Sequence, residues 1–122
     1  QSGSFRGKKI ALIGSGLIGR NWAVLFARAG YNVCMYDISA QQLQTAMHDL
    51  QHFRIPLLAK YDMLFGCEPH TVLSRISTSS DLPSTLKEAV LIQEGVPENV
   101  ALKQSVFKTI SDALYQLYGA QC

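Results

Sequence analysis

A glycine-rich segment near the start of the chain has the composition of a phosphate-binding turn. Residues 14–19 read Gly-Ser-Gly-Leu-Ile-Gly, which fits the pattern G-x-G-x-x-G, and they follow an apolar run at residues 10–13. In such a turn Gly14 permits the sharp change of direction, Gly16 lets a pyrophosphate approach the backbone, and Gly19 lets a helix pack closely against the strand. The free amides at the start of that helix would face the phosphates. We therefore predict a dinucleotide-binding turn in preference to a structural turn without a ligand.

An acidic residue stands at the distance from this turn where a ribose is usually held. Asp37 follows Gly19 by eighteen residues, directly after the apolar run 33–36. A carboxylate there can accept hydrogen bonds from the adenosine ribose hydroxyls, and residues 38–42 include no Lys or Arg to neutralise a 2′-phosphate. The pattern predicts NAD as the cofactor rather than NADP. The alternative is that Asp37 caps the next helix, a role for which Ser39 is the rival candidate.

Two strands and a helix must position these residues, and the hydrophobic pattern predicts all three. The runs 10–13 and 33–36 are short and continuously apolar, as strands buried on both faces of a parallel sheet are. Between them we predict a helix over 17–29, with Gly30 in the left-handed conformation at its end. Its apolar residues at helical spacing are Ile18, Trp22, Leu25, Phe26 and Ala29. Strand, helix and strand form a βαβ unit of about thirty residues.

Helices and strands continue to alternate after this unit. A second amphipathic helix is predicted over 43–57, where Pro56 should kink the helix or end its first segment. Its apolar face would consist of Leu43, Ala46, Met47, Leu50, Phe53 and Leu57. We then predict a loop at 62–71, a strand at 76–78, a helical turn at 84–88, a strand at 90–93 and a helix from Glu98 to Gly119. The fold class is therefore α/β, a Rossmann-type doubly wound parallel sheet with strand order 3-2-1-4.

The composition excludes several other classes of protein. The 122 residues are 48% hydrophobic, and 11 basic and 9 acidic residues give a net charge of +2, so we expect no nucleic-acid partner. No apolar stretch reaches the roughly 18 residues of a membrane span, so we expect no membrane partner either. Cys34, Cys67 and Cys122 are too few and too far apart for a disulfide framework or a zinc knuckle. Reduced thiols fit a cytoplasmic location.

Two histidines have the spacing of ligands in a known zinc motif. His48 and His52 lie four residues apart on the second predicted helix, like the histidines of the zinc motif H-E-x-x-H. Asp49 replaces the glutamate, its side chain is one methylene too short for that role, and no third ligand is evident. We interpret the segment as a polar helix face and predict no metal.

Three segments together resemble the 3-hydroxyacyl-CoA dehydrogenase family. They are residues 14–23, residues 36–38, and residues 92–99, which read Ile-Gln-Glu-Gly-Val-Pro-Glu-Asn. The third segment is much more specific than the glycine pattern, although Gly95 stands where a cysteine is expected. The resemblance covers about residues 8–118 without a gap between the motifs. It implies that Leu17 and Ile18 touch the cofactor, that Asp37 holds the ribose, and that Glu98 and Lys103 approach the cofactor from a later loop and helix.

The resemblance also implies an activity for the whole protein. We expect an NAD-dependent oxidoreductase that transfers a hydride between a 3-hydroxy acid, such as L-gulonate, and NAD. Its helical domain and its catalytic residues are expected beyond residue 122, none of them in this chain, and the full-length protein is expected to be a homodimer. We assign residues 1–7 to a tag or disordered leader and residues 8–122 to an incomplete NAD-binding domain.

Two alternatives remain open for the function. The first is an L-3-hydroxyacyl-CoA dehydrogenase, but relatives of that kind offer CoA a serine and a lysine where this chain has Phe53 and Lys60. The second is a non-catalytic protein, either a truncated dinucleotide-binding fragment or a structural protein of the crystallin kind.

Overall fold

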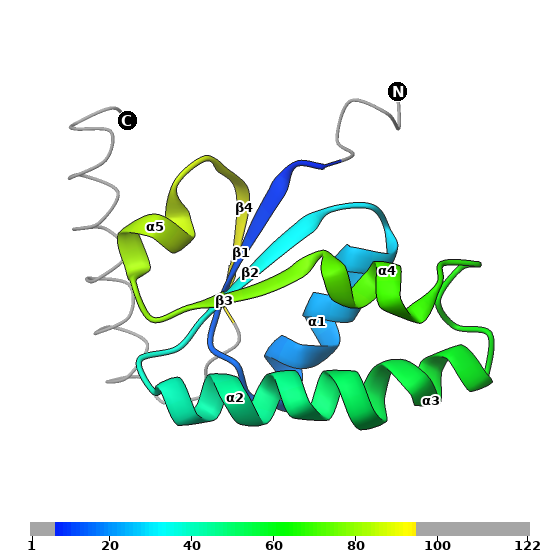
Figure 1. Ribbon diagram of the computed structural model, residues 1–122. Helices are drawn as coiled ribbons and strands as arrows, with labels where there is room; N and C mark the ends of the chain where they lie inside the picture. The colour runs from blue at the N-terminus through cyan, green and yellow to red at the C-terminus, as the bar shows by residue number, and fades with distance from the viewer. Residues whose placement is uncertain (1–6, 95–122) are drawn as a thin grey trace.

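Four parallel strands form the single sheet of residues 7–94, which are the residues that the computed structural model describes (Figure 1). The spatial order is β3-β2-β1-β4, as predicted. The central pair is in register from Lys9 opposite Asn32 to Ile13 opposite Tyr36. The strands are β1 (Lys9–Ile13), β2 (Asn32–Tyr36), β3 (Ile76–Ser79) and β4 (Ala89–Glu94).

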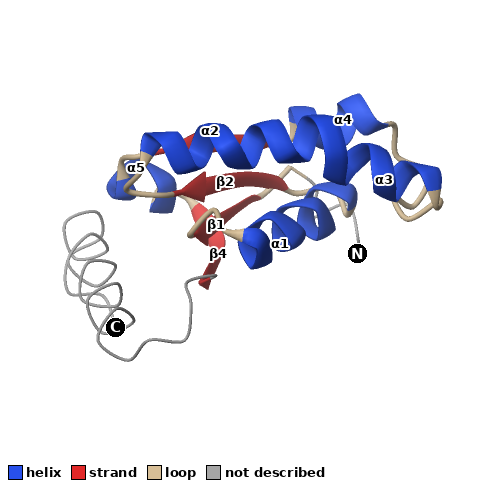
Figure 2. Cartoon of the chain, turned by 90° about the horizontal axis from the view of Figure 1, so that it is seen from below, coloured by secondary structure: helices blue, strands red, loops and turns tan. Residues whose placement is uncertain are grey.

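Helices cover both faces of the sheet because alternate residues of each strand point to opposite sides. Ile10 and Leu12 of β1 belong to the larger core, beneath α1 to α4, whereas Ala11 and Ile13 pack against α5 (Figure 1). Both α1 and α2 begin next to the carboxyl ends of the parallel strands β1 and β2 (Figure 2). The helical segments are α1 (Leu17–Arg28), α2 (Ala40–Asp49), the π-helix η2 (Leu50–Arg54), α3 (Ile55–Lys60), α4 (Pro69–Ser74) and α5 (Leu82–Leu86).

The predicted helix over 17–29 is confirmed as α1, and the face that it buries consists mostly of small residues. The large apolar residues Trp22 and Phe26 are only partly buried, with their rings stacked 5.5 Å apart. The buried side of the helix consists of Gly19, Arg20, Ala23, Val24 and Ala27. Small residues at every fourth position let α1 lie close to the sheet, and the large rings pack at its flank. Helical spacing of the large apolar residues therefore predicts the helix but not the face that contacts the sheet, because a close approach requires small side chains.

The helical stretch that contains Pro56 is continuous from Ala40 to Lys60. The predicted break does not occur at the proline, although α2 itself ends earlier, at Asp49, where a π turn follows. In this turn the amide of Ile55 donates to the carbonyl of Leu50, five residues back instead of four. The turn is thus wider than an α-helical turn, and Pro56 follows it directly, in the first turn of α3.

The π turn also changes which residues of this stretch are buried. Phe53 and Leu57, predicted for the apolar face, are 62% and 56% exposed, whereas Ile55 is 2% exposed. The burial pattern of Leu43, Ala46 and Leu50 continues at Ile55 because one extra residue is accommodated in the turn. A period of 3.6 residues cannot predict this shift.

One short helix was not predicted, and another begins earlier than the sequence predicts. Pro69 opens α4 inside the predicted loop, in agreement with the preference of proline for the first helical turn. Helix α5 begins at Leu82 because the side chain of Asp81 accepts a hydrogen bond from the amide of Ser84 at 3.0 Å. The predicted strands at 76–78 and 90–93 are confirmed as β3 and β4.

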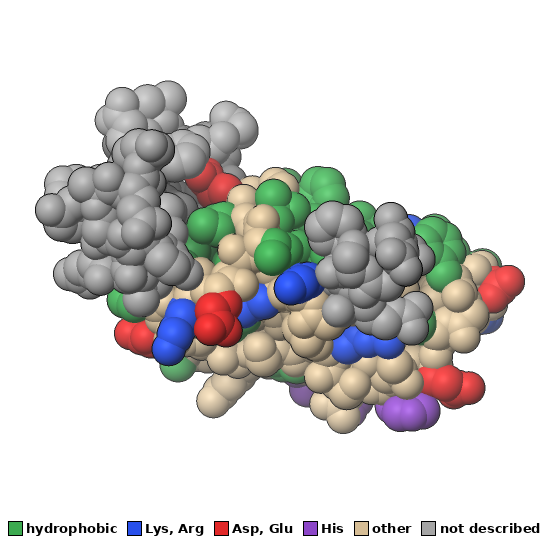
Figure 3. All heavy atoms as spheres, turned by 90° about the horizontal axis from the view of Figure 1, so that it is seen from above, with side chains coloured by type: hydrophobic (Ala, Val, Ile, Leu, Met, Phe, Trp, Pro, Cys, Tyr) green, Lys and Arg blue, Asp and Glu red, His purple; other side chains and the backbone are tan. Residues whose placement is uncertain are grey.

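β4 forms one edge of the sheet and exposes apolar side chains. Val90 and Leu91 are 52% and 43% exposed, and hydrophobic side chains gather on the face seen from above (Figure 3). The predicted helix from Glu98 to Gly119 lies outside the described residues. At the N-terminal end of the described residues, the amide of Gly7 donates a hydrogen bond to the carbonyl of Gly30 at 3.0 Å.

Within residues 7–94 no helix is long and apolar enough to cross a membrane.

Candidate cofactor-binding site

The glycine turn connects β1 to α1 and has the tight geometry that we predicted. Gly14 has a φ of 105°, a left-handed conformation that favours glycine. Its amide donates to the carbonyl of Tyr36 at 2.8 Å, which fixes the turn against the end of β2. A Cβ atom added to Gly19 would lie 2.5 Å from the carbonyl oxygen of Gly14. The close packing predicted for Gly19 is therefore confirmed.

Gly16 differs from these two glycines because neither its backbone conformation nor its packing requires a glycine at this position. Its φ of −72° and ψ of −171° are open to any residue, and a Cβ added there would meet no atom within 4 Å. Gly16 is also the N-cap of α1, and no side chain caps the first turn of that helix. The turn thus presents open space in front of the amides at a helix N-terminus, where phosphates bind. The site fits the pyrophosphate of a dinucleotide.

Two apolar side chains stand at the entrance to this turn. Leu17 and Ile18 are 62% and 60% exposed, although they lie in the first turn of α1. Their exposure leaves them available to a ligand, and their contact with the cofactor stays a prediction.

The carboxylate of Asp37 lies beside the glycine turn, at the carboxyl end of β2. Its Oδ2 accepts hydrogen bonds from Ser15 Oγ at 2.7 Å and from the Ser15 amide at 3.2 Å. Its Oδ1 accepts from the amide of Ser39 at 3.0 Å. Ser39 is the N-cap of α2, where its hydroxyl accepts from the amide of Gln42 at 3.1 Å. The capping role proposed as the alternative for Asp37 therefore belongs to Ser39.

A buried arginine supports the turn from behind, and the sequence analysis missed it. Arg20 is 7% exposed, its Nε donates to the carbonyl of Ser15 at 3.0 Å, and its guanidinium pairs with Asp49 at 3.1 Å. Asp49 also pairs with Arg54 at 3.0 Å. The signal was available in the sequence, because position 20 lies between the small apolar positions 19 and 23 of α1. A charged residue there indicates a buried ion pair.

Asp49, which we had considered only as a poor substitute in a zinc motif, is thus a partner of two arginines. Burial raises the pKa of its carboxyl, but the hydrogen bonds and the charges of Arg20 and Arg54 outweigh this effect and hold the pKa below its ordinary value. Arg54 follows Asp49 by five residues, a spacing that the π turn brings onto one face. His48 and His52 contact each other with ring centroids 4.5 Å apart. Among residues 7–94, no group of three His, Cys, Asp or Glu could hold a metal ion.

The lowered pKa of Asp49 predicts an acid-sensitive contribution to stability. Because the carboxyl has a lower pKa in the folded chain than in the unfolded chain, its stabilisation is complete above the unfolded pKa, about 4. It is lost as the pH falls through the folded pKa. We expect the melting temperature of the wild type to fall more steeply below about pH 4 than that of Asp49→Asn, as measured by thermal unfolding from pH 7 to pH 2. Parallel curves would contradict this prediction.

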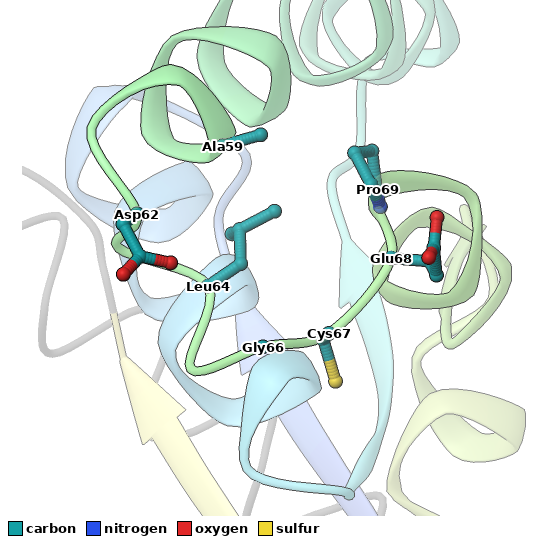
Figure 4. A pocket seen from close by; sticks show the side chains of 7 residues that line it. All are labelled: Ala59, Asp62, Leu64, Gly66, Cys67, Glu68 and Pro69. Carbon is teal, nitrogen blue, oxygen red and sulfur yellow. The ribbon is translucent and has the colours of Figure 1, made fainter.

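A separate hollow of about 250 Å³ lies between α3 and α4 (Figure 4). It is lined by Ala59, Asp62, Leu64, Gly66, Cys67, Glu68 and Pro69, none of which belongs to the glycine turn or to the end of β2. The sulfur of Cys67 points out of it and lies 3.7 Å from the carbonyl oxygen of Arg28. The hollow is therefore not part of the candidate cofactor site, and the predicted contacts of Glu98 and Lys103 lie outside the described residues.

Comparisons with known proteins agree with this geometry. The family described as "3-hydroxyacyl-CoA dehydrogenase, NAD binding domain" matches residues 9–116. The lambda-crystallin homolog of Mus musculus is 39% identical over 98 residues, which cover 80% of this chain and 31% of the relative. An L-carnitine dehydrogenase of Bacillus cereus is 33% identical over 84% of this chain and 30% of its own length.

Solved structures show the same fold. The 3-hydroxybutyryl-CoA dehydrogenase of Escherichia coli K12 superposes with a TM-score of 0.73 and 26% identity, over 88% of this chain and 22% of that one. The chain spans about a third of the length of the curated relatives that it matches. A glycine turn with open space at Gly16, a carboxylate at the end of β2 and a family match over most of the chain lead to one conclusion. The chain belongs to the 3-hydroxyacyl-CoA dehydrogenase family, in which this part is the NAD-binding domain.

Proposed function

We propose that this domain serves an oxidoreductase that transfers a hydride between a 3-hydroxy acid, L-gulonate in particular, and NAD. The observation that carries the proposal is Asp37, whose carboxylate is held beside the glycine turn with no Lys or Arg in the five residues that follow it. Such a carboxylate favours a free ribose hydroxyl over a 2′-phosphate. When bound, NAD supplies the nicotinamide that accepts the hydride. This chain would bind and orient the cofactor, with the pyrophosphate at Gly16 in the turn that Gly14 and Gly19 shape, and with Leu17 and Ile18 touching the cofactor.

The substrate assignment is supported by the match to lambda-crystallin homologs and by the resemblance of this chain's motifs, which implies L-gulonate. An acyl-CoA substrate is the second candidate, because the E. coli structure is a 3-hydroxybutyryl-CoA dehydrogenase. Against it, Phe53 is 62% exposed at the position where the resemblance places a CoA-binding serine. A small hydroxy acid has no need of that contact. The base that removes the hydroxyl proton, the homodimer and the cytoplasmic location are parts of the proposal for the full-length protein.

Cofactor preference is tested by calorimetric titration of the 122-residue chain with NADH and with NADPH. We expect NADH to bind more tightly, and we expect Asp37→Ala to weaken NADH binding about 10- to 100-fold, because hydrogen bonds from the ribose to a carboxylate are lost. NADPH binding should change little or improve. The matched control is Glu68→Ala, which removes an exposed carboxylate that makes no cap hydrogen bond and should leave both affinities unchanged.

The substrate is tested on the protein at the full length of its relatives. NAD reduction with L-gulonate, and none with 3-hydroxybutyryl-CoA, would support the proposal. The reverse result would favour the acyl-CoA candidate. Tight NADH binding without turnover of either substrate would favour a non-catalytic protein of the crystallin kind.

A further inference from the structure

Ser15 is the residue of the glycine turn that has no role in the usual account of such turns. It occupies the first variable position of the pattern, and its side chain is completely buried. Its hydroxyl donates to Asp37 Oδ2 at 2.7 Å, the shortest of the hydrogen bonds that this carboxylate accepts. A hydroxyl that donates to a carboxylate makes a strong, charge-assisted hydrogen bond. The turn and the acidic residue are thus joined by a side chain, not only by the backbone.

The three hydrogen bonds of Asp37 divide its carboxylate into two unequal halves. Oδ2 accepts from both the hydroxyl and the amide of Ser15, whereas Oδ1 accepts from the amide of Ser39 alone. Each carboxylate oxygen can accept about two hydrogen bonds. Oδ2 is therefore saturated within the chain, and Oδ1 retains one acceptor position for a ligand.

Ser15 is itself held from the opposite side. The Nε of Arg20 donates to its carbonyl at 3.0 Å, and the guanidinium is anchored by Asp49. The peptide that carries the hydroxyl therefore has a fixed orientation, with the arginine on its carbonyl and Asp37 on its amide and side chain. A fixed donor can hold the carboxylate in one rotamer.

We propose that Ser15 is a positioning residue for cofactor selection, whose hydroxyl holds Asp37 Oδ2 so that Oδ1 is directed to the adenosine ribose. The inference rests on the proposed function, in which Asp37 binds the ribose. Without the hydroxyl, Oδ2 keeps only the longer bond from the Ser15 amide, at 3.2 Å, and the carboxylate can turn. A turned carboxylate no longer directs Oδ1 to the ribose hydroxyl of NAD, and it repels a 2′-phosphate less. The preference for NADH over NADPH should therefore decrease.

The test is a double-mutant cycle on the 122-residue chain, with NADH and NADPH affinities measured by calorimetry. Ser15→Ala should weaken NADH binding about 5- to 10-fold and change NADPH binding less than about twofold. In the Asp37→Ala background the same substitution should change NADH binding less than about twofold, because no carboxylate is left to position. A purely structural role for Ser15 would not produce this dependence on Asp37.

Ser39→Ala is the matched control. It removes the hydroxyl that caps α2 but keeps the amide that donates to Asp37 Oδ1, so the melting temperature should fall while the ratio of the two affinities stays constant. If Ser15→Ala does not fold, Ser15→Cys takes its place, since a thiol keeps the side chain but donates only weakly.

The outcomes separate this inference from the proposed function. An unchanged affinity ratio in Ser15→Ala, with tight NADH binding by the wild type, would overturn the role of Ser15 and leave the function of the domain intact. An equal loss of NADH and NADPH binding in both backgrounds would also overturn it, because Ser15 would then act only through the shape of the turn. A folded wild type that binds neither dinucleotide would overturn both proposals.

Discussion

Gly19→Ala is expected to destabilise the chain by about 3 kcal/mol, the largest effect that we predict for a single methyl group. The added Cβ would lie 2.5 Å from the carbonyl oxygen of Gly14, and this atom belongs to the backbone of a turn that is hydrogen-bonded to β2. Neither the turn nor α1 can move without disturbing the close contact of the helix with the sheet. Thermal unfolding should show a decrease in melting temperature of about 10 °C or more.

Gly16→Ala provides the matched control, since it adds the same methyl group three residues earlier. The space there is empty and the backbone is extended, so the free energy of unfolding should change by about 1 kcal/mol or less, the cost of a poorer N-cap. NADH binding should nevertheless weaken about tenfold or more, because the methyl group would occupy the space of the pyrophosphate. Equal melting temperatures for Gly19→Ala and the wild type would show that the turn and α1 are less closely packed than we describe.

Asp49→Ala is expected to cost about 3 kcal/mol, because it leaves the guanidinium of Arg20 without its carboxylate partner in a buried position. The side chain of Arg20 is 9% exposed, and its remaining hydrogen bond in the structure is to the carbonyl of Ser15. A buried charge that loses its partner retains the full cost of desolvation. Denaturant unfolding of the variant and the wild type would measure the difference.

Two further variants test this explanation. Arg54→Met removes the more exposed arginine of the group and leaves the Arg20–Asp49 pair intact, so it should cost about 1 kcal/mol or less. Arg20→Met combined with Asp49→Leu removes the buried charge together with its partly buried partner and should be more stable than Asp49→Ala alone. If Arg54→Met were as damaging as Asp49→Ala, the burial of Arg20 would not be the cause.

The sheet and the turn could be predicted from the sequence because few other structures have this pattern of residues. A short apolar run that ends at a glycine pattern, a helix, and a second apolar run that ends at an acidic residue are typical of a βαβ unit with parallel strands. Asp37 could be placed at the end of β2 from spacing alone, but spacing could not separate its two possible roles. The cap that Ser39 provides removes the capping role from Asp37, and its contact with the ribose stays a prediction.

Each of the residues that escaped prediction did so for its own physical reason. The pattern G-x-G-x-x-G treats position 15 as variable, so it gives no indication that the Ser15 hydroxyl reaches Asp37. An arginine on a helix is normally assigned to solvent, and only its spacing from Ala23 and Ala27 marks Arg20 as buried. Large apolar residues such as Trp22 and Phe26 dominate a hydrophobic pattern, which gives no indication that the small residues of α1 form its contact with the sheet.

The π turn at Leu50–Arg54 has a consequence for how the length of this helix could change during evolution. A π turn is equivalent to an α-helix into which one residue has been inserted. With one residue fewer, Leu50 and Ile55 would be four positions apart and would still share the buried face. Asp49 and Arg54 would also be four positions apart, a spacing at which side chains on a helix can pair. Pro56, in contrast, would then lie inside a regular helix, where its ring clashes with a carbonyl of the preceding turn at a cost of about 3 kcal/mol. The less costly order of events is therefore the insertion first and the proline afterwards, since only the longer helix accepts the proline.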